Sequence, residues 1–530
     1  MEEAALLADI CRTWGEVLEL PAEQVQANSH FLQLGGDSLH WTRMVLRIQE
    51  VWGLALPVHP QSALATPARL AGYCRQQLLL SEPPVVTGAE LPESSGASFP
   101  ATVIQRGLWF AEQLAGKGSL YQNAVLLHFS GRLDTDRLRA AFWQLLEDVP
   151  ILRANFNWDT HTRRLCCSYR LLPATLDTDL LPCRELAIEA LPAAVDEAVA
   201  LPLTLERDSL CRALLFRSGA HSWHLLLLAH HLVCDGWSGD LLLRRLAATY
   251  RGAPTVADHG FAAYARQAGQ PGDGPARLGP DGAGSDKPDL HESDLDKLAW
   301  WRSQLEGLEA SQRWLWGEQQ QTAPWPHAVA QRYLPLSAAL CARCGASALR
   351  AGVSFFMLCQ TACKQALWRL SGVESQVLAI PCALRSAAEE EAIGCFVAVQ
   401  LSVSRQLREA DSKLVLQEED RQFRQARATG LALQELNAAL KPATLPDGNP
   451  WSSVLLAFQN FPHFGMAWPA LACRLERVAA RQSQFALCLE FVPAGEGWCL
   501  RLEYARELFN AERLAQLESA LLLSFEQLAD

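Results

Sequence analysis

The amino-acid sequence predicts a multidomain protein in which a small all-α unit precedes a much larger α/β region. At 530 residues the chain is too long for one hydrophobic core. Apolar residues recur at helical spacing through roughly the first 80 residues, whereas strand-like and helical runs alternate in the remainder. Hydrophobic content of 49% and charged content of 20% are typical of soluble globular proteins.

The N-terminal unit is expected to be a minimal helical bundle. Residues 4–18 and 37–52 form two amphipathic patterns, which a long loop connects. Thr66 is a helix cap with Pro67 in the first helical position, and this third helix is expected to run to about residue 80. Three or four helices in a unit of this length are enough for a bundle.

The region after the bundle begins with a linker and is divided by a second break. Residues 81–98 are rich in Pro, Ser, Gly and Glu and lack periodicity, which is typical of a linker. From Phe99 onward, strand-like runs at 123–129 and 221–229 alternate with helical runs such as 134–146. Residues 269–289, dense in Gly, Pro and Asp, are either a domain boundary or an inserted loop, and helical signal resumes at 295–305.

Charge and hydropathy argue against several classes of partner. The net charge of −12 and the lack of clustered Lys and Arg predict no nucleic-acid partner. The apolar run Leu225 to Val233 is interrupted by two histidines and is too short to span a bilayer. Glu2 and Glu3 open the chain where a signal peptide would carry basic residues. We therefore expect no membrane association and a cytoplasmic location.

Sixteen cysteines are present, with irregular spacing. Cys341 and Cys344 form a CxxC pair, and Cys359 and Cys363 follow, all within helical periodicity. A zinc ribbon needs clustered pairs on turns, whereas cysteines inside helices usually serve packing. We expect these cysteines to lie in a core, and we expect no metal site.

A serine motif occupies the start of the second predicted helix. The segment Phe31 to Leu39 reads FLQLGGDSL, so that Ser38 follows two glycines that permit a tight turn. Unpaired amides at a helix N-terminus favour a nearby phosphate, and a serine there would be exposed for phosphodiester attachment. The alternative is that Asp37 or Ser38 is simply a helix cap.

A histidine motif follows the strand-like run of residues 221–229. The sequence AHHLVCDGWS places His230 and His231 side by side, and neighbouring strand residues point to opposite faces. One histidine is therefore expected to be structural and the other free for chemistry. Asp235 is expected to be buried and to need a cationic partner or several hydrogen bonds, and Gly236 lets a ligand approach the backbone. The alternatives are two satisfied core histidines beside a capping aspartate, or a metal site, although adjacent strand histidines do not converge on one ion.

The N-terminal unit resembles an acyl or peptidyl carrier protein across its full length. The resemblance rests on a helix, a long loop, the LGGDSL segment and further helices within residues 1–80. It implies a four-helix bundle with 4′-phosphopantetheine attached covalently to Ser38, next to Asp37. A phosphopantetheinyl transferase would install the group, whose thiol holds the substrate as a thioester.

The pattern HHxxxDG resembles that of the condensation domains of nonribosomal peptide synthetases. Further segments match that family in its order: Ile104–Trp109, Pro150–Phe156, Trp300–Leu305, Ile393–Val397, Asn449–Pro450, Phe458–Asn460, Leu502–Tyr504 and Leu508–Phe509. The resemblance implies a condensation domain over residues 99–530, built as two chloramphenicol-acetyltransferase-like lobes. The lobes would cover about 99–268 and about 290–530, with residues 269–289 as the connecting loop.

The resemblance also assigns roles to the residues of the motif. His231 would lie at the centre of a tunnel between the lobes, where it positions or deprotonates the acceptor amine, with His230 beside it. Asp235 would be structural and paired with an arginine of the second lobe, for which Arg385 is the candidate. The amide of Gly236 would approach the thioester carbonyl.

Some positions depart from the family pattern. Ala398 stands where the family usually has Asn, the segment 433–436 is a weak match, and Ala486 replaces an acidic residue. These departures weaken any inference about the substrate. Ala229 before the two histidines excludes the three-histidine variant associated with β-lactam formation, and the DxxxxD of heterocyclising relatives is absent.

The predicted function is amide-bond formation by an acyltransferase-type condensation domain. Because the carrier precedes that domain, Ser38 would hold the donor, supplied through an upstream adenylation domain, and the acceptor would arrive on a downstream carrier or as a free amine. The chain is expected to be a monomeric piece of a larger synthetase. The alternatives are ester formation, a non-catalytic platform that docks a tailoring enzyme, and epimerisation, although residues 237–240 look more like condensation sequences.

The carrier assignment predicts where the prosthetic group is attached. Incubation of the chain with a phosphopantetheinyl transferase and coenzyme A should add one phosphopantetheine mass, measured on the intact protein. Ser38→Ala removes the only hydroxyl expected to form the phosphodiester, so this variant should gain no mass. A modified Ser38→Ala protein would contradict the assignment.

Overall fold

The structure is a computed structural model, and its description covers most of the chain. The described residues are 3–18, 20, 24–29, 34, 44, 47–48, 66–80, 98–115, 120–159, 164–172, 180–268, 292–308, 313–315, 327–405, 407, 411–440, 449, 451–459, 468, 471–495 and 497–530. The serine motif at Asp37 and Ser38, most of the predicted helix 37–52, the linker and the loop 269–289 lie outside these ranges.

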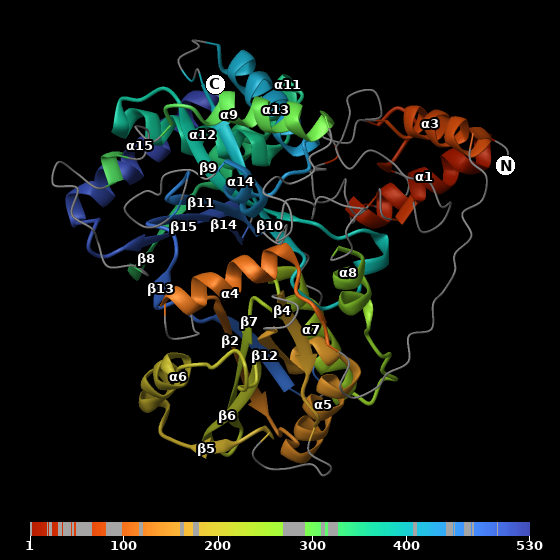
Figure 1. The fold of residues 1–530 in the computed structure, drawn as a ribbon, viewed down its shortest axis with the longest axis vertical. Helices are drawn as coiled ribbons and strands as arrows, with labels where there is room; N and C mark the ends of the chain where they lie inside the picture. The colour runs from red at the N-terminus through yellow and green to blue at the C-terminus, as the bar shows by residue number, and fades with distance from the viewer. Residues whose placement is uncertain are drawn as a thin grey trace.

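Two of the predicted N-terminal helices are present and pack together (Figure 1). Helix α1 spans Glu3–Leu18 and helix α3 spans Pro67–Leu80, with Thr66 accepting a hydrogen bond from a first-turn amide. Buried residues of α1 recur at positions 6, 10 and 14, one helical turn apart, and meet buried residues of α3 such as Leu70 and Cys74. The helices that periodicity predicts over residues 4–18 and from Pro67 to about residue 80 are therefore confirmed.

The first lobe is built on a five-stranded sheet in the order β12-β2-β7-β6-β5. Its strands are β2 (Gln122–Gly131), β5 (Cys183–Glu185), β6 (Cys211–Gly219), β7 (Ser222–His230) and β12 (Leu471–Arg477). A small sheet in the order β1-β4-β3 adjoins it, with strands β1 (Phe99–Pro100), β3 (Ala154–Asp159) and β4 (Arg164–Tyr169). The expected strands at 123–129 and 221–229 are thus confirmed.

Helices cover both faces of the five-stranded sheet, which explains why β7 is almost wholly apolar. Leu225 and Leu227 of β7 belong to the core shared with α5 and α7, whereas Leu226 and Leu228 pack with residues of α6. The helices and 3₁₀ turns of this lobe are α4 (Val103–Ala115), α5 (Thr135–Asp148), η3 (Pro150–Arg153), η5 (Ile188–Ala190), α6 (Leu191–Ala200), α7 (Gly236–Tyr250) and α8 (Gly260–Ala268).

The second lobe is built on a seven-stranded sheet in the order β10-β9-β11-β14-β15-β8-β13. Its strands are β8 (His327–Leu336), β9 (Gln376–Ala383), β10 (Val397–Ser404), β11 (Val454–Phe458), β13 (Gln482–Ser483), β14 (Leu487–Ala494) and β15 (Gly497–Ala505). Its helical elements are α9 (Glu292–Leu305), η7 (Arg313–Leu315), α11 (Ala338–Ala351), α12 (Phe355–Ser371), η8 (Ala387–Glu389), α13 (Ser412–Ala428), α14 (Leu433–Leu440) and α15 (Ala511–Ala529).

One strand of the first sheet comes from the C-terminal part of the chain. Strand β12 pairs antiparallel with β2 over seven residues, from Leu471 opposite Gly131 to Arg477 opposite Val125. In Figure 1 this blue strand lies among the orange and yellow strands of the first lobe. The chain then returns to the second sheet through β13 and β14. The two lobes are therefore joined by a shared sheet as well as by side-chain contacts.

The core of the second lobe encloses cysteines and one ion pair. Cys344 of α11 and Cys359 and Cys363 of α12 are buried among its apolar residues, as expected for packing residues. Lys364 and Glu419 are also buried, with 0% and 3% of their side chains exposed. The ammonium group of Lys364 lies 2.8 Å from a Glu419 carboxylate oxygen and 2.9 Å from the hydroxyl of Ser402, so that α12, α13 and β10 are connected. Burial lowers the pKa of Lys364, and Glu419 opposes that shift.

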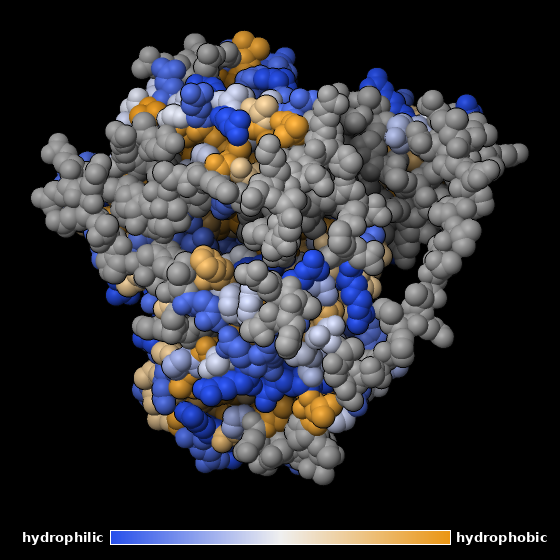
Figure 2. Space-filling model, viewed as in Figure 1, coloured by the Kyte–Doolittle hydropathy of each residue, from blue (hydrophilic) through white to orange (hydrophobic). Residues whose placement is uncertain are grey.

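The visible surface of the described residues mixes polar and apolar side chains. Figure 2 shows hydrophilic residues predominating over the first lobe, in the lower half of the view, with smaller apolar groups between them. Among the described helices, none has both the length and the apolar character that crossing a bilayer requires.

The buried pair Lys364–Glu419 predicts an asymmetric response to mutation. Lys364→Met leaves the Glu419 carboxylate buried without its counter-ion, so the free energy of unfolding should fall by about 3–5 kcal/mol. The double variant Lys364→Met/Glu419→Leu removes both charges and should recover most of that loss. Urea unfolding of the three proteins measures both effects. Equal stability of the single variant and the parent would contradict the interpretation.

Candidate functional site

The two adjacent histidines at the end of β7 have different surroundings. His230 is fully buried, and its Nε2 lies 2.9 Å from Oε1 of the buried Glu112. Its Nδ1 accepts a hydrogen bond of 3.1 Å from the amide of Leu232. Because Nδ1 accepts a hydrogen bond, the proton of the neutral ring lies on Nε2, where it points at the Glu112 carboxylate. Both ring nitrogens of His230 are thus engaged inside the protein.

Glu112 connects this buried histidine to its neighbour. The same oxygen, Oε1, accepts a hydrogen bond of 2.7 Å from the amide of Tyr121, and the carbonyl of Tyr121 accepts one of 2.8 Å from the amide of His231. Glu112 was not predicted from the sequence, although a signal existed. Ile104, Leu108 and Glu112 follow one another at four-residue intervals on α4, so that a carboxylate occupies the next position of an apolar stripe.

His231 is half-buried and lines a cavity. Its Nε2 lies 3.1 Å from the side-chain Nδ2 of Asn123, and the ring of Tyr121 meets it edge-on with centroids 6.4 Å apart. Burial lowers the pKa of His231 to about 4; the neighbouring His230 acts in the same direction, and Asp235 acts against it. The imidazole is therefore neutral near pH 7, and it is the histidine of the motif that faces open space.

Asp235 closes the N-terminus of α7 and binds the second lobe at the same time. Its Oδ1 accepts hydrogen bonds from the amide of Ser238 at 2.7 Å and from Nη2 of Arg385 at 3.0 Å. Its Oδ2 accepts one of 2.9 Å from the amide of Phe396. Asp235 and Arg385 are only 4% and 6% exposed, so the pair is buried. Asp235 and Arg385, which the sequence predicts to be partners, are therefore in contact.

The two Nη atoms of Arg385 also have other partners. Its guanidinium donates to the carbonyl of Glu389 at 2.7 Å and to the hydroxyl of Ser238 at 2.6 Å. The guanidinium carbon lies 4.2 Å from the centre of the Phe396 ring, a cation–π contact. Such a set of partners offsets the cost of taking a buried ion pair out of water.

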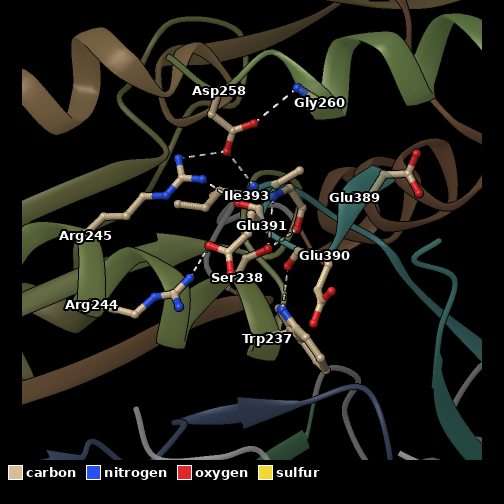
Figure 3. Close-up of polar contacts among 12 residues, drawn as sticks. Trp237, Ser238, Arg244, Arg245, Asp258, Gly260, Glu389, Glu390, Glu391 and Ile393 are labelled. Atoms are coloured by element: carbon tan, nitrogen blue, oxygen red, sulfur yellow. Dashed lines mark hydrogen bonds and ion pairs between the residues drawn. The ribbon is translucent and has the colours of Figure 1, made fainter. Parts of the chain in front are cut away.

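Further contacts between the lobes surround this pair, and Figure 3 shows their polar part. Trp237 of α7 donates to the carbonyl of Glu390 at 3.0 Å. Asp258 accepts hydrogen bonds from Arg245 of the same lobe at 3.0 Å and from the amide of Ile393 at 2.8 Å. Arg244 forms an ion pair with Glu391. We call the contact of residues 237–260 with residues 389–396 the interlobe contact.

The glycine of the predicted Ile393–Val397 segment has a steric reason to be there. A Cβ atom at Gly394 would lie 2.1 Å from the ring of Phe261 in α8. The backbone of residue 394 therefore packs directly on an aromatic ring of the first lobe. The carbonyl of Gly394 accepts from the amide of Asp235 at 3.0 Å and from the hydroxyl of Ser238 at 2.8 Å, which ties this segment to the start of α7.

A cavity of about 1210 Å³ lies between the lobes. His231 and Gly236 line it from the first lobe, and residues of β9, β10, β11 and β14 line it from the second. Gly236 is exposed and is the first residue of α7. On another side of the cavity, the hydroxyl of Tyr121 bonds the side chain of Gln484, which in turn donates to Asn449 at 2.9 Å.

The candidate residues that fall within the described ranges therefore meet at one place. His231 and Gly236 line the cavity, and so do the buried Asp235 and Arg385, which are also held by partners, whereas His230 does not line it. Asp37 and Ser38 lie outside the described residues. Within the described part of the chain, no group of three or more His, Cys, Asp or Glu side chains is arranged to hold a metal ion.

Comparison with known proteins identifies two families along the chain. The family described as "Condensation domain" matches residues 97–272 and 289–530. The family described as "Phosphopantetheine attachment site" matches residues 8–74, a range that includes Ser38. The first match covers well over half of the chain.

Curated relatives are long synthetases. The "Probable non-canonical nonribosomal peptide synthetase (NRPS) CymA" of Salinispora arenicola is 29% identical over 95% of this chain, which spans 6% of its length. The dimodular nonribosomal peptide synthase of Bacillus subtilis is 28% identical over 98% of this chain, which spans 21% of its length.

Solved structures share the fold. A complex of the X-domain and OxyB from teicoplanin biosynthesis matches 85% of this chain and 96% of its own with a TM-score of 0.67 at 22% identity. The first condensation domain of the calcium-dependent antibiotic synthetase, bound to a substrate analogue, matches 82% of this chain and 98% of its own with a TM-score of 0.61 at 18% identity. The expected α/β fold of the large region is confirmed. The chain belongs to the condensation domain family and carries a phosphopantetheine attachment site N-terminal to that domain, in a region also matched by the synthetases described above.

Proposed function

We propose that the condensation domain forms an amide bond between a donor acyl group carried on Ser38 and an acceptor amine. The proposal assigns residues 1–80 to the carrier, 81–98 to a linker and 99–530 to the condensation domain, with lobes at about 99–268 and 290–530. The observation that carries it is the placement of His231 at a cavity between the lobes, 3.1 Å from a cavity-facing amide and next to two motif residues that are fully occupied by other partners.

The chemistry needs little from the protein beyond positioning. The prosthetic group on Ser38 supplies the thioester. The amine nitrogen attacks the thioester carbonyl, a C–N bond forms and the C–S bond breaks, while the amine loses one proton and the leaving sulfur gains one. His231 accepts a hydrogen bond from the attacking amine, either to orient it or to take its proton. The exposed amide of Gly236 faces the carbonyl oxygen where negative charge develops.

Two features of the site support this assignment of roles. Both ring nitrogens of His230 and both carboxylate oxygens of Asp235 already have hydrogen-bond partners in the protein, which leaves His231 as the motif side chain available to a substrate. A cavity that receives two tethered substrates raises their effective concentration, so a covalent intermediate is unnecessary. The role of Arg385 is then to hold Asp235, and through it the start of α7.

The proposal also implies partners. A phosphopantetheinyl transferase would modify Ser38, and an upstream adenylation domain would supply the donor. The acceptor would arrive on another carrier or as a free amine. No step requires a metal ion.

A non-catalytic docking platform is the second candidate. It is favoured by the likeness to a solved X-domain whose structure is described as a complex with OxyB. Against it stand the histidine pair, the aspartate and the glycine of the motif, which are all present here. The two functions differ in whether product formation requires the side chain of His231.

The test is amide formation by the full chain with Ser38 loaded from acyl-coenzyme A by a phosphopantetheinyl transferase. Aminoacyl N-acetylcysteamine thioesters serve as soluble acceptors, and products are measured by mass spectrometry. His231→Ala should lower the rate by about 100-fold or more, because the amine loses its hydrogen-bond partner. His221→Ala, at an exposed histidine in the β6–β7 turn, is the matched control and should leave the rate unchanged.

Other outcomes select the alternatives. Product formation that survives His231→Ala would support a docking platform. Racemisation of an L-aminoacyl donor on the carrier without any acceptor would support epimerisation, and product formation only with hydroxyl acceptors would support ester synthesis. Each of these results would overturn amide formation.

A further inference from the structure

A side-chain amide that the family motif does not include lies against the reactive edge of His231. Asn123 of β2 stands opposite Ala229 of β7 in the antiparallel register. Because residues two apart share a face of a strand, the side chain of Asn123 lies on the side toward which His231 projects, and the small Ala229 leaves room between them. Asn123 is exposed and lines the cavity, and its Nδ2 lies 3.1 Å from Nε2 of His231.

Because His231 is neutral, the donor in its hydrogen bond with Asn123 determines which ring nitrogen carries the proton. The ring is neutral near pH 7, since burial lowers its pKa to about 4, with His230 lowering it further and Asp235 opposing. Tyr121, packed edge-on, presents no charge to the ring. A neutral imidazole carries one proton, on either Nδ1 or Nε2. Because Asn123 presents its amide nitrogen, it donates and Nε2 accepts, which places the proton on Nδ1.

We propose that Asn123 is a positioning residue that holds Nε2 of His231 as a hydrogen-bond acceptor until the acceptor amine replaces it. Both donors are N–H groups at the same ring nitrogen, so the exchange requires no change of tautomer and leaves no unpaired acceptor. The amine then meets a lone pair that already points into the cavity. This inference rests on the proposed amide-forming function, and it extends the reacting centre to a residue of β2.

The first test measures the tautomer and needs no turnover. The full chain is labelled with ¹⁵N-histidine, and the resonances of His231 are assigned by their loss in His231→Ala. At pH 7 the parent protein should show an unprotonated Nε2 and a protonated Nδ1. Asn123→Asp presents only acceptor atoms, so Nε2 should become protonated. Asn157→Ala, at an exposed asparagine on β3, is the matched control and should not change the spectrum.

The second test measures the rate of amide formation with the acyl-loaded chain and the N-acetylcysteamine acceptors. Asn123→Leu leaves the tautomer unselected and should lower the maximal rate by about tenfold, with little change in the acceptor concentration needed for half the maximal rate. Asn123→Asp selects the wrong tautomer and should lower the rate further, although it keeps the size of the side chain. Thermal unfolding identifies a variant that fails to fold, and the other variant then carries the test.

The two tests separate the possible failures. A protonated Nε2 in the parent protein, or an unchanged ring in Asn123→Asp, would overturn the role of Asn123. Parent-like amide formation by the folded Asn123→Asp variant would overturn it as well. If the parent protein forms no amide while the tautomer changes as expected, the amide-forming function fails and the hydrogen bond between Asn123 and His231 stands.

Discussion

The ion pair between Asp235 and Arg385 is the contact on which the geometry of the site depends. It is buried, it joins the two lobes, and the same aspartate closes the N-terminus of α7. Loss of either partner would leave a charge without compensation between the lobes, which is far more costly than loss of a surface pair. Gly236 follows Asp235 directly and His231 precedes it by four residues, so the pair anchors the segment that brings both to the cavity.

Next to this pair, a chain of hydrogen bonds gives His230 and His231 different surroundings, although their side chains are chemically identical. Glu112 holds His230 and the amide of Tyr121, and the carbonyl of Tyr121 holds the backbone of His231. One imidazole is thereby committed to structure, while the other keeps a nitrogen at the cavity. Unpaired buried polar groups are costly, and this network pairs both ring nitrogens of His230 inside the protein.

The sequence was sufficient for local structure and for the residues of the motif. Periodicity identified α1, α3, β2 and β7, because each buries one face or both faces in a regular pattern. It could not identify β12, whose seven residues carry a weak alternation and whose partner strand lies more than 300 positions earlier in the chain. Asn123 was missed for a related reason, since a single polar residue in a strand acquires its meaning only from a neighbour across the sheet. Ser38 remains a prediction from its motif and its family.

The passage of β12 into the first sheet limits how the two halves of the condensation domain can move. Seven residues of the C-terminal part are paired with β2, so full separation of the lobes would break a continuous ladder of backbone hydrogen bonds, each worth roughly 1 kcal/mol. Rotation about that strand leaves the ladder intact and is the less costly motion. Delivery of a bulky substrate on a flexible tether into the existing cavity is therefore less costly than admitting it by separation of the lobes.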